Sequence, residues 1–221
     1  MAIKNKLAVN ENEPLSAPDN ARHNTVGIEI KQLRKARKMT LKDLSKRANI
    51  SVSYISTIER GSGKPSVDAI EAIANALDVD VHWFFPVRQG AGPLEKTYIV
   101  RAKNRRNLNR VYNQSADEIG YTDSLLSSSI GGRFYMGISR YAPGADRPDE
   151  PFHQHGGEEH GVVIKGELEM KLGQEVITLR EGDSYSFEAS ILHHGRNRTE
   201  NETTLVWAVS PVVIPKEVEQ D

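Results

Sequence analysis

Apolar residues between Val26 and Phe85 recur at the spacing of an α-helix, in several short stripes. The first stripe opens with Val26, Ile30 and Leu33 at positions i, i+4 and i+7. Each later stripe follows a residue type that commonly caps a helix N-terminus, namely Thr40, Ser51, Ser66 and Asp80. The pattern predicts five helices, at residues 26–38, 41–48, 52–60, 67–77 and 81–85.

The second and third predicted helices are separated by only Asn49, Ile50 and Ser51. Asn adopts the left-handed backbone conformation more readily than most residues, and a sharp turn after a helix requires that conformation. Apolar pairs such as Met39 and Leu44 flank three of the four caps, which marks the helix starts further. The segment therefore predicts helix-turn-helix geometry.

The spacing of apolar residues changes after Arg88–Pro93, a stretch with two glycines and a proline that predicts a linker. Short segments rich in β-forming residues follow. They predict strands at Tyr98–Ala102, Phe134–Tyr141, Val162–Ile164, Glu167–Leu172, Val176–Leu179, Ser184–Phe187 and Thr204–Ser210. Short strands with no helices between them favour an antiparallel sandwich or barrel.

These patterns predict a multi-domain α plus β fold. The 221 residues are enough for two domains that each bury a core. Residues 1–24 are rich in Asn, Glu and Pro and predict a flexible arm. The remaining parts are an all-α domain at residues 25–87, a linker at 88–96 and an all-β domain at 97–221.

Charge is distributed unevenly along the chain. From Asn24 to Lys64 there are ten basic and three acidic residues, whereas from Gln89 onward there are 15 basic and 20 acidic residues. This asymmetry is typical of a chain in which only the first domain contacts phosphates. The sequence contains no cysteine, no apolar run of membrane-spanning length and no signal-peptide pattern. We therefore expect a cytoplasmic protein with no membrane partner.

The stretch Ser51–Gly61, SVSYISTIERG, and the wider segment Thr40–Pro65 closely resemble the xenobiotic-response-element (XRE) family of regulators. The resemblance implies a five-helix, lambda-repressor-like domain, similar to that of phage repressors and Cro, with double-stranded DNA as its partner. It also implies that Arg34 and Glu59 form an ion pair within the domain.

The residues of the third predicted helix divide between two faces. Ile55 and Ile58 lie on the face that we expect to be buried, and the opposite face is expected to enter the major groove. Basic residues near the helix ends are expected to contact phosphates, and the alternative for each is a solvated surface charge. The predicted DNA-binding residues are Lys42, Ser51, Val52, Ser53, Ser56, Thr57, Arg60 and Lys64.

Two spaced motifs lie in the predicted all-β domain. The first is H-x-H-x3-E-x6-G, from His153 to Gly166, and the second is H-x3-N, at His193 and Asn197. In these motifs the sequence resembles the cupin superfamily, which implies a small jelly-roll barrel with each motif on a β-hairpin. The second motif departs from the family pattern by having Glu188 at a usual proline and Ser190 at a usual glycine. Both departures concern the hairpin turn and leave the ligands unchanged.

The motif residues suit a metal ion. Side chains at i and i+2 of a strand point to one side, so His153 and His155 can both face the barrel interior. Glu159 and His193 would join them from other strands, giving three imidazoles and one carboxylate. That set suits a divalent transition metal such as Zn, Fe, Mn, Ni or Cu, with positions left for water or ligand. The alternative is a polar pocket without metal. His160, His194 and Glu158 are placed outside the ligand set.

The order of the two domains resembles that of bacterial regulators of the putrescine-utilisation-repressor type. This resemblance implies a homodimeric repressor of a catabolic operon whose barrel binds a small-molecule effector, such as an amine, an amino acid or a related metabolite. Two alternatives are a metal-dependent cupin enzyme of the dioxygenase or isomerase type and a regulator for which the metal is the signal. We find no acid–base or nucleophile set beyond the metal ligands, so we assign no catalytic residue and expect no enzyme.

Overall fold

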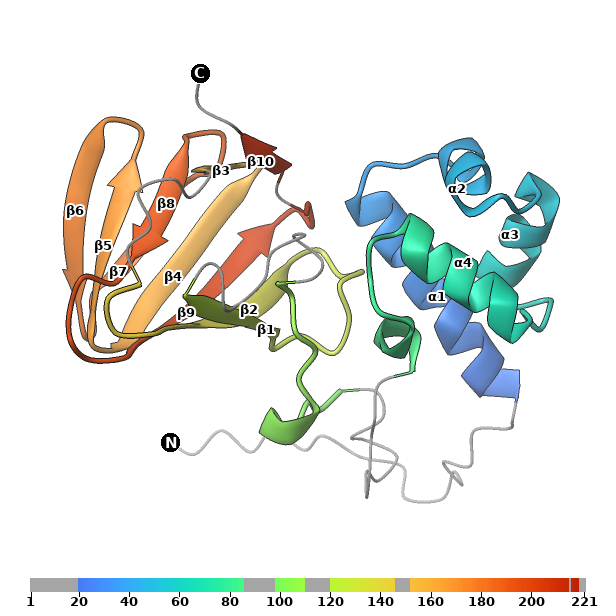
Figure 1. Cartoon of the computed structure of the whole chain (residues 1–221), viewed down its shortest axis with the longest axis horizontal. Helices are drawn as coiled ribbons and strands as arrows, with labels where there is room; N and C mark the ends of the chain where they lie inside the picture. The colour runs from blue at the N-terminus through green and yellow to red at the C-terminus, as the bar shows by residue number, and fades with distance from the viewer. Residues whose placement is uncertain (1–19, 86–97, 110–119, 146–151, 215, 219–221) are drawn as a thin grey trace, which may run out of the picture.

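Four α-helices form the N-terminal domain of the computed structural model, which describes residues 20–85, 98–109, 120–145, 152–214 and 216–218. They are α1 (Asn20–Ala36), α2 (Leu41–Ala48), α3 (Val52–Glu59) and α4 (Val67–Ala76), and the short 3-10 helix η1 (Val81–Phe84) follows them (Figure 1). The apolar stripes of the sequence meet in one core. Its fully buried members include Ile30, Leu33, Leu44, Ile55, Ile58, Ile73 and Leu77.

Polar side chains fix the helix starts where the sequence predicts them. The Thr40 hydroxyl accepts a hydrogen bond from the Asp43 backbone N–H, and the Asp43 carboxylate accepts one from the Thr40 backbone N–H. Ser51 and Ser66 cap α3 and α4 with their hydroxyls. Asn49 ends α2 in the left-handed conformation, with φ 54° and ψ 41°. The predicted helix-turn-helix is therefore confirmed in its caps and its turn.

The prediction of five α-helices is wrong, because the segment after Asp80 forms only a 3-10 helix. The Asp80 carboxylate accepts a hydrogen bond from the His82 backbone N–H, and the Phe85 N–H donates to the His82 carbonyl. Four residues closed in this way complete no α-helical turn. In addition, α1 begins at Asn20 rather than at residue 26, so it includes the end of the predicted arm. The rest of that arm and the predicted linker at 88–96 lie outside the described residues.

Ten strands form the C-terminal β-domain in the described part of the chain. They are β1 (Tyr121–Leu125), β2 (Tyr135–Tyr141), β3 (Phe152–Gln154), β4 (Glu158–Lys165), β5 (Glu167–Leu172), β6 (Glu175–Arg180), β7 (Ser184–Glu188), β8 (His193–Arg196), β9 (Thr203–Ser210) and β10 (Lys216–Val218). Antiparallel pairing gives two five-stranded sheets, in the orders β1-β2-β9-β4-β7 and β10-β3-β8-β5-β6 (Figure 1). Leu168 and Met170 of one sheet and Leu205 and Trp207 of the other are buried, so the core lies between the sheets.

The predicted strand at Tyr98–Ala102 is wrong. Tyr98 and Ile99 are exposed, and the segment leads into a 3-10 helix, η2 (Ala102–Asn104), instead of joining a sheet. The β-forming side chains there have no neighbouring strand against which to pack. The β-forming pattern did not mark β1, β3, β8 or β10, although the metal-ligand motifs placed His153 and His193 on strands. None of the helices in the described part of the chain has the length and apolar character of a membrane span.

Candidate metal centre and nucleic-acid interface

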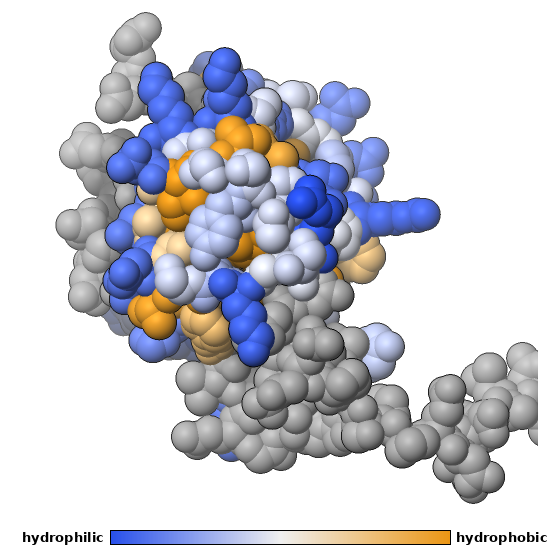
Figure 2. All heavy atoms as spheres, turned by 90° about the vertical axis from the view of Figure 1, so that its right-hand side faces the viewer, coloured by the Kyte–Doolittle hydropathy of each residue, from blue (hydrophilic) through white to orange (hydrophobic). Residues whose placement is uncertain are grey.

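One face of α3 is solvent-accessible at the end of the molecule remote from the β-domain (Figure 1). Ile55 and Ile58 are buried beneath it, as the sequence predicts. Figure 2 shows this end of the molecule, where hydrophilic side chains surround a paler and partly apolar centre. Among the predicted DNA-binding residues, Ser56 and Thr57 are half-buried, and the exposed ones are Lys42, Ser51, Val52, Ser53, Arg60 and Lys64.

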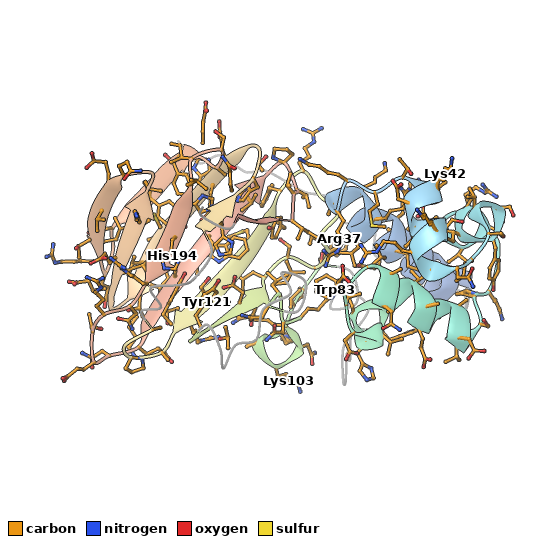
Figure 3. All side chains as sticks on the ribbon, turned by 45° about the horizontal axis from the view of Figure 1, so that its top comes forward. Arg37, Lys42, Trp83, Lys103, Tyr121 and His194 are labelled. Atoms are coloured by element: carbon orange, nitrogen blue, oxygen red, sulfur yellow. The ribbon has the colours of Figure 1, made fainter. Side chains whose placement is uncertain are left out.

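Hydrogen bonds within α3 give several of these side chains partners in the free protein. Arg60 Nη1 donates to Ser56 Oγ at 2.5 Å, and Thr57 Oγ1 donates to the Ser53 carbonyl at 2.9 Å. Ser51 Oγ accepts from the Tyr54 backbone N–H, so this residue already acts as a helix cap. Lys42 projects from the start of α2 into solvent (Figure 3). The structure thus gathers the predicted set around one face, and its contact with DNA stays a prediction.

A buried ion pair fixes α3 to α1, as the family resemblance implies. Arg34 Nε lies 2.7 Å from Glu59 Oε1, and Arg34 Nη2 donates to Glu59 Oε2 at 2.9 Å. Arg34 Nη1 also donates to the Met39 carbonyl at 2.7 Å. The hydrogen bond to Glu59 raises the pKa of Arg34 despite its burial. These bonds to α1 therefore fix the position of the C-terminal end of α3, the predicted recognition helix.

A cavity of about 70 Å³ lies between the two sheets of the β-domain. One water molecule needs roughly 10–15 Å³ of such space, so the cavity has room for only a small molecule. The predicted metal ligands lie on its wall, together with aromatic and acidic side chains. The lining residues include Tyr121, Asp123, Ser139, Tyr141, His153, His155, Glu159, Tyr185, His193, His194 and Trp207.

Three of the four predicted ligands converge. Glu159 Oε2 lies 3.5 Å from His155 Nε2 and also 3.5 Å from His193 Nε2. The potential ligand atoms of all three residues lie within 4.8 Å of one another. His155 follows the end of β3, Glu159 lies on β4 and His193 begins β8, so the cluster joins both sheets. Two imidazoles and one carboxylate form a cluster that could hold a metal ion.

The outer nitrogens of both imidazoles face backbone carbonyls. His193 Nδ1 lies 2.8 Å from the Ile191 carbonyl, and His155 Nδ1 lies 3.3 Å from the Gly156 carbonyl. A carbonyl only accepts hydrogen bonds, so Nδ1 carries the proton and the Nε2 lone pair is directed at the cluster. Within the described part of the chain, the buried His155 Nε2 has no hydrogen-bond partner. A cation at the centre of the cluster would satisfy it.

Tyr185 orients the carboxylate of the cluster. Its hydroxyl donates to Glu159 Oε1 at 2.7 Å, which leaves Oε2 for the two imidazoles. Tyr185 on β7 pairs with Gly161 on β4. A Cβ at Gly161 would lie 2.5 Å from the Tyr185 ring, so only glycine lets the ring lie across this strand. The local sequence thus places a hydrogen-bond donor behind a candidate metal ligand.

The protonation states of the cluster suit a cation. Burial raises the pKa of Glu159, but the adjacent His155 and His193 imidazoles and the hydrogen bond from the Tyr185 hydroxyl outweigh it and hold that pKa below its ordinary value. Burial lowers the pKa of His193. At neutral pH the cluster therefore combines an anionic carboxylate with a neutral His193 imidazole, the forms that bind metals.

The fourth predicted ligand, His153, lies on the same cavity but outside this cluster. It pairs with His193 in the β3–β8 ladder, and its Nε2 lies 3.4 Å from the Tyr121 hydroxyl. Burial lowers its pKa to about 4, so it is neutral near pH 7. His194 also lines the cavity. His160 is exposed and pairs with Glu158, outside the cluster as predicted.

The sequence did not predict the cavity-lining residues that lie outside the two cupin motifs. Asp123 on β1 is buried, and burial raises its pKa to about 7. The Ser139 hydroxyl donates to this carboxylate and itself accepts from Trp207 Nε1 at 2.7 Å. The Tyr121 ring, which faces the barrel interior in Figure 3, stacks on Tyr141 with ring centroids 4.8 Å apart. Along β1, Tyr121 and Asp123 alternate with less buried residues and so lie on the same face of the strand.

Two family models match the chain in separate regions: a helix-turn-helix model at residues 30–84 and a cupin domain model at residues 137–209. The HTH-type transcriptional regulator SutR of Escherichia coli is 29% identical over 168 residues, which cover 76% of this chain and 84% of SutR. The immunity repressor protein of Bacillus phage phi105 is 47% identical over 57 residues. That match covers 26% of this chain and 40% of the repressor, so it spans less than half of the relative's length.

A solved structure that matches the chain is the hydroxypropylphosphonic acid epoxidase from S. wedmorenis. It is 18% identical, covers 85% of this chain and 97% of its own, and gives a TM-score of 0.41.

We expect the protein to bind a divalent metal ion with an affinity that depends on the side chains of this cluster. Isothermal titration of Zn²⁺ into chelator-treated protein should show one site per chain. His193→Ala should weaken binding by at least about 100-fold, and Tyr185→Phe by about 10–100-fold, because outer hydrogen bonds orient the ligands. The exposed His160→Ala is the matched control and should bind like the wild type. Equal affinities for His193→Ala and His160→Ala would exclude this cluster as the site, and His153→Ala tests the fourth ligand.

The raised pKa of Asp123 predicts that the folding stability of the chelator-treated protein depends on pH. Its pKa rises from 3.8 to about 7 on folding, so folding stability is lost as the pH rises from about 4 through 7. Asp123→Asn should remove that loss, and its melting temperature should exceed that of the wild type at pH 8 but not at pH 4. The gain is up to a few kcal/mol, at about 1.4 kcal/mol per pKa unit. The exposed Glu158→Gln is the control. No gain at pH 8 would refute the assignment.

Proposed function

We propose that a small molecule in the cupin cavity controls how tightly the helix-turn-helix domain holds operator DNA, because the chain combines an XRE-type helix-turn-helix domain with a cupin domain and is similar over most of its length to the transcriptional regulator SutR. The observation that carries the proposal is the combination of two features in one chain. The solvent-accessible face of α3 is fit for a major groove, and the cavity of the β-domain presents a cluster fit for a metal ion.

The helix-turn-helix domain is proposed to place α3 in the major groove of double-stranded DNA. Ser53 and Thr57 are the candidates for base edges, and Val52 is the candidate for a thymine methyl group. Lys42, Arg60 and Lys64 are the candidates for phosphate contacts. Because two recognition helices are needed to read two half-sites, a homodimer is the proposed assembly. A repressor of a catabolic operon remains the expected role.

The cavity is proposed to bind a small effector beside a divalent transition metal. His155, Glu159 and His193 would hold the ion, with His153 as the candidate fourth ligand. A bound metal would supply an electrophilic anchor for an oxygen or nitrogen of the effector. Asp123 offers a carboxyl group on β1, and no Lys or Arg is present among the described residues that line the cavity. This wall favours an effector with a hydrogen-bond donor, such as a small amine or amino acid.

The ligand set also favours one rival. Two imidazoles with one carboxylate are the ligands of non-haem Fe(II) oxygenases, so a metal-dependent cupin enzyme is the second candidate. The helix-turn-helix domain in the same chain favours the regulator over the enzyme. Oxygen consumption by the Fe(II)-loaded protein with small amine substrates would favour the enzyme.

Salt-dependent binding to DNA tests the proposed function. In fluorescence anisotropy with the promoter fragment next to its own gene, the wild type should lose affinity steeply as salt rises. Lys64→Ala should weaken binding and reduce the slope of log K against log salt by about one. Thr57→Ala should weaken binding to this promoter more than to a random duplex.

Lys165→Ala is the matched control, because this exposed lysine lies on β4 of the β-domain. The assignment of α3 and its flanking loop as the DNA interface fails if Lys64→Ala and Lys165→Ala have the same effect. The regulator proposal itself fails if the wild type shows no salt-sensitive affinity for any duplex.

A further inference from the structure

An ion pair joins the helical domain to the β-domain. Arg106, which follows η2, faces Glu29 on α1, and the two residues are 77 positions apart. Arg106 Nη1 donates to Glu29 Oε2 at 2.7 Å, and Nη2 donates to Oε1 at 3.1 Å. The two side chains are only 10% and 12% exposed. A bidentate pair of this kind fixes orientation as well as distance.

Two further contacts hold the Arg106 guanidinium in place. It lies 5.0 Å from the ring centroid of Trp83, which belongs to η1 of the helical domain. Figure 3 shows Trp83 on the side of the helical domain that faces the β-domain. Arg106 Nη2 also donates to the Ser128 carbonyl of the β-domain at 3.0 Å. One guanidinium therefore contacts both domains, and arginine is the residue whose planar fork and flat face serve both contacts.

The backbone around Arg106 is bonded to the strand that walls the cavity. The Leu125 N–H donates to the Arg106 carbonyl at 2.8 Å, and the Leu108 N–H donates to the Asp123 carbonyl at 2.8 Å. The Asn109 amide bonds the backbone of β1 twice, accepting from the Asp123 N–H at 2.8 Å and donating to the Tyr121 carbonyl at 3.1 Å. The side chains of Tyr121 and Asp123 line the cavity. A shift of β1 would therefore move Arg106.

On the other side of the ion pair, α1 is in close contact with the recognition helix. A Cβ at Gly27 would lie 2.0 Å from the Ile58 carbonyl, so the α1 backbone lies directly against the end of α3. The buried Arg34–Glu59 pair bonds the same two helices. Glu29 lies between Gly27 and Arg34 on α1, so a displacement of Glu29 would also displace α3.

A second contact between the two domains has fewer polar interactions than the Arg106–Glu29 pair. The Ile214 N–H donates to the Ala36 carbonyl at 3.3 Å, at the C-terminal end of α1. This single backbone bond fixes a distance but little orientation. The Arg106 contact, by comparison, combines charge, bidentate geometry and burial, so it restricts the relative orientation of the two domains more than the backbone bond does.

We propose that Arg106 is the positioning residue that transmits occupancy of the cupin cavity to the DNA-binding domain, through β1 on one side and Glu29 on the other. The inference rests on the proposed function, because it supplies the physical connection between the effector cavity and α3. Removing the ion pair should leave both domains folded and able to bind their ligands. Removal of the ion pair should, however, abolish the effect that the cavity ligand and operator DNA have on each other's binding affinity.

The first readout is the relative position of the domains, which needs no effector. The chain has no native cysteine, so Glu71→Cys on α4 and Glu175→Cys on β6 accept one spin label each, and both positions are exposed. Pulsed electron paramagnetic resonance should give one narrow distance distribution in the otherwise wild-type chain. Arg106→Gln and Glu29→Gln should each broaden it, and the double variant should add little, because both remove one interaction.

The matched control is Arg180→Gln. Arg180 pairs with Glu167 at 3.5 Å, but both residues lie in the β-domain and are more exposed. Its distance distribution should equal that of the parent. Circular dichroism melting checks that each variant is folded.

The second readout is coupling, with Zn²⁺ alone as the cavity probe. The ratio of operator affinities with and without Zn²⁺ should be about 5–150 for the wild type, the range of typical allosteric couplings. It should fall to about 1 in Arg106→Gln and Glu29→Gln, while Zn²⁺ affinity measured without DNA stays unchanged. Retention of the wild-type ratio in these variants overturns the proposal. If the wild type itself shows a ratio of 1, the proposed function fails with this probe. The transmitting role of Arg106 then fails as well, whereas unchanged distance distributions in the two variants overturn its positioning role by themselves.

Discussion

The candidate metal site depends on one arrangement in the cupin domain, in which the largely enclosed carboxylate of Glu159 faces two imidazole nitrogens. Burying Glu159 without a cation is unfavourable, yet contacts with His155, His193 and Tyr185 hold its pKa low, so that it stays ionised. Backbone carbonyls at the outer nitrogens direct both imidazole lone pairs inward. These groups form a site that could hold a metal ion. The cavity is small, and β1 contributes Tyr121 and Asp123 to its wall.

The helical domain depends on a different kind of constraint, in which caps and buried ion pairs fix short helices. Thr40, Ser51 and Ser66 satisfy backbone donors that the short helices α2, α3 and α4 could not satisfy internally. Arg34 and Glu59 then bond α1 to α3 in the core of the domain. A recognition helix held so firmly has little freedom of its own. Regulation would therefore move the domain as a unit, which is consistent with a rigid contact through Arg106 and Glu29.

Much of this was predictable from the sequence, and the exceptions have physical reasons. The caps, the turn at Asn49, the Arg34–Glu59 pair and six of the strands are visible in the sequence because each rests on local residue chemistry or on an extended family motif. The fifth helix was wrong because Val81–Phe84 is too short for α-helical hydrogen bonds, and Tyr98–Ala102 was wrong because strand formation needs a neighbouring strand. Spacing places His153 on the cavity wall, but the reach of its ring toward the cluster depends on strand position in three dimensions. Asp123, Ser139 and Trp207 come from strands distant in sequence, so only the fold brings them together.

The central claim is that occupancy of the cavity and binding of DNA are energetically linked within one chain. Linkage is reciprocal, so operator DNA must change the affinity for a cavity ligand by the factor with which that ligand changes the affinity for DNA. The direct measurement is calorimetric titration of Zn²⁺ into the wild-type protein, free and saturated with operator. The account predicts two different Zn²⁺ affinities whose ratio equals the ratio of operator affinities measured with and without Zn²⁺. Identical Zn²⁺ affinities in the free and the DNA-bound protein would contradict it.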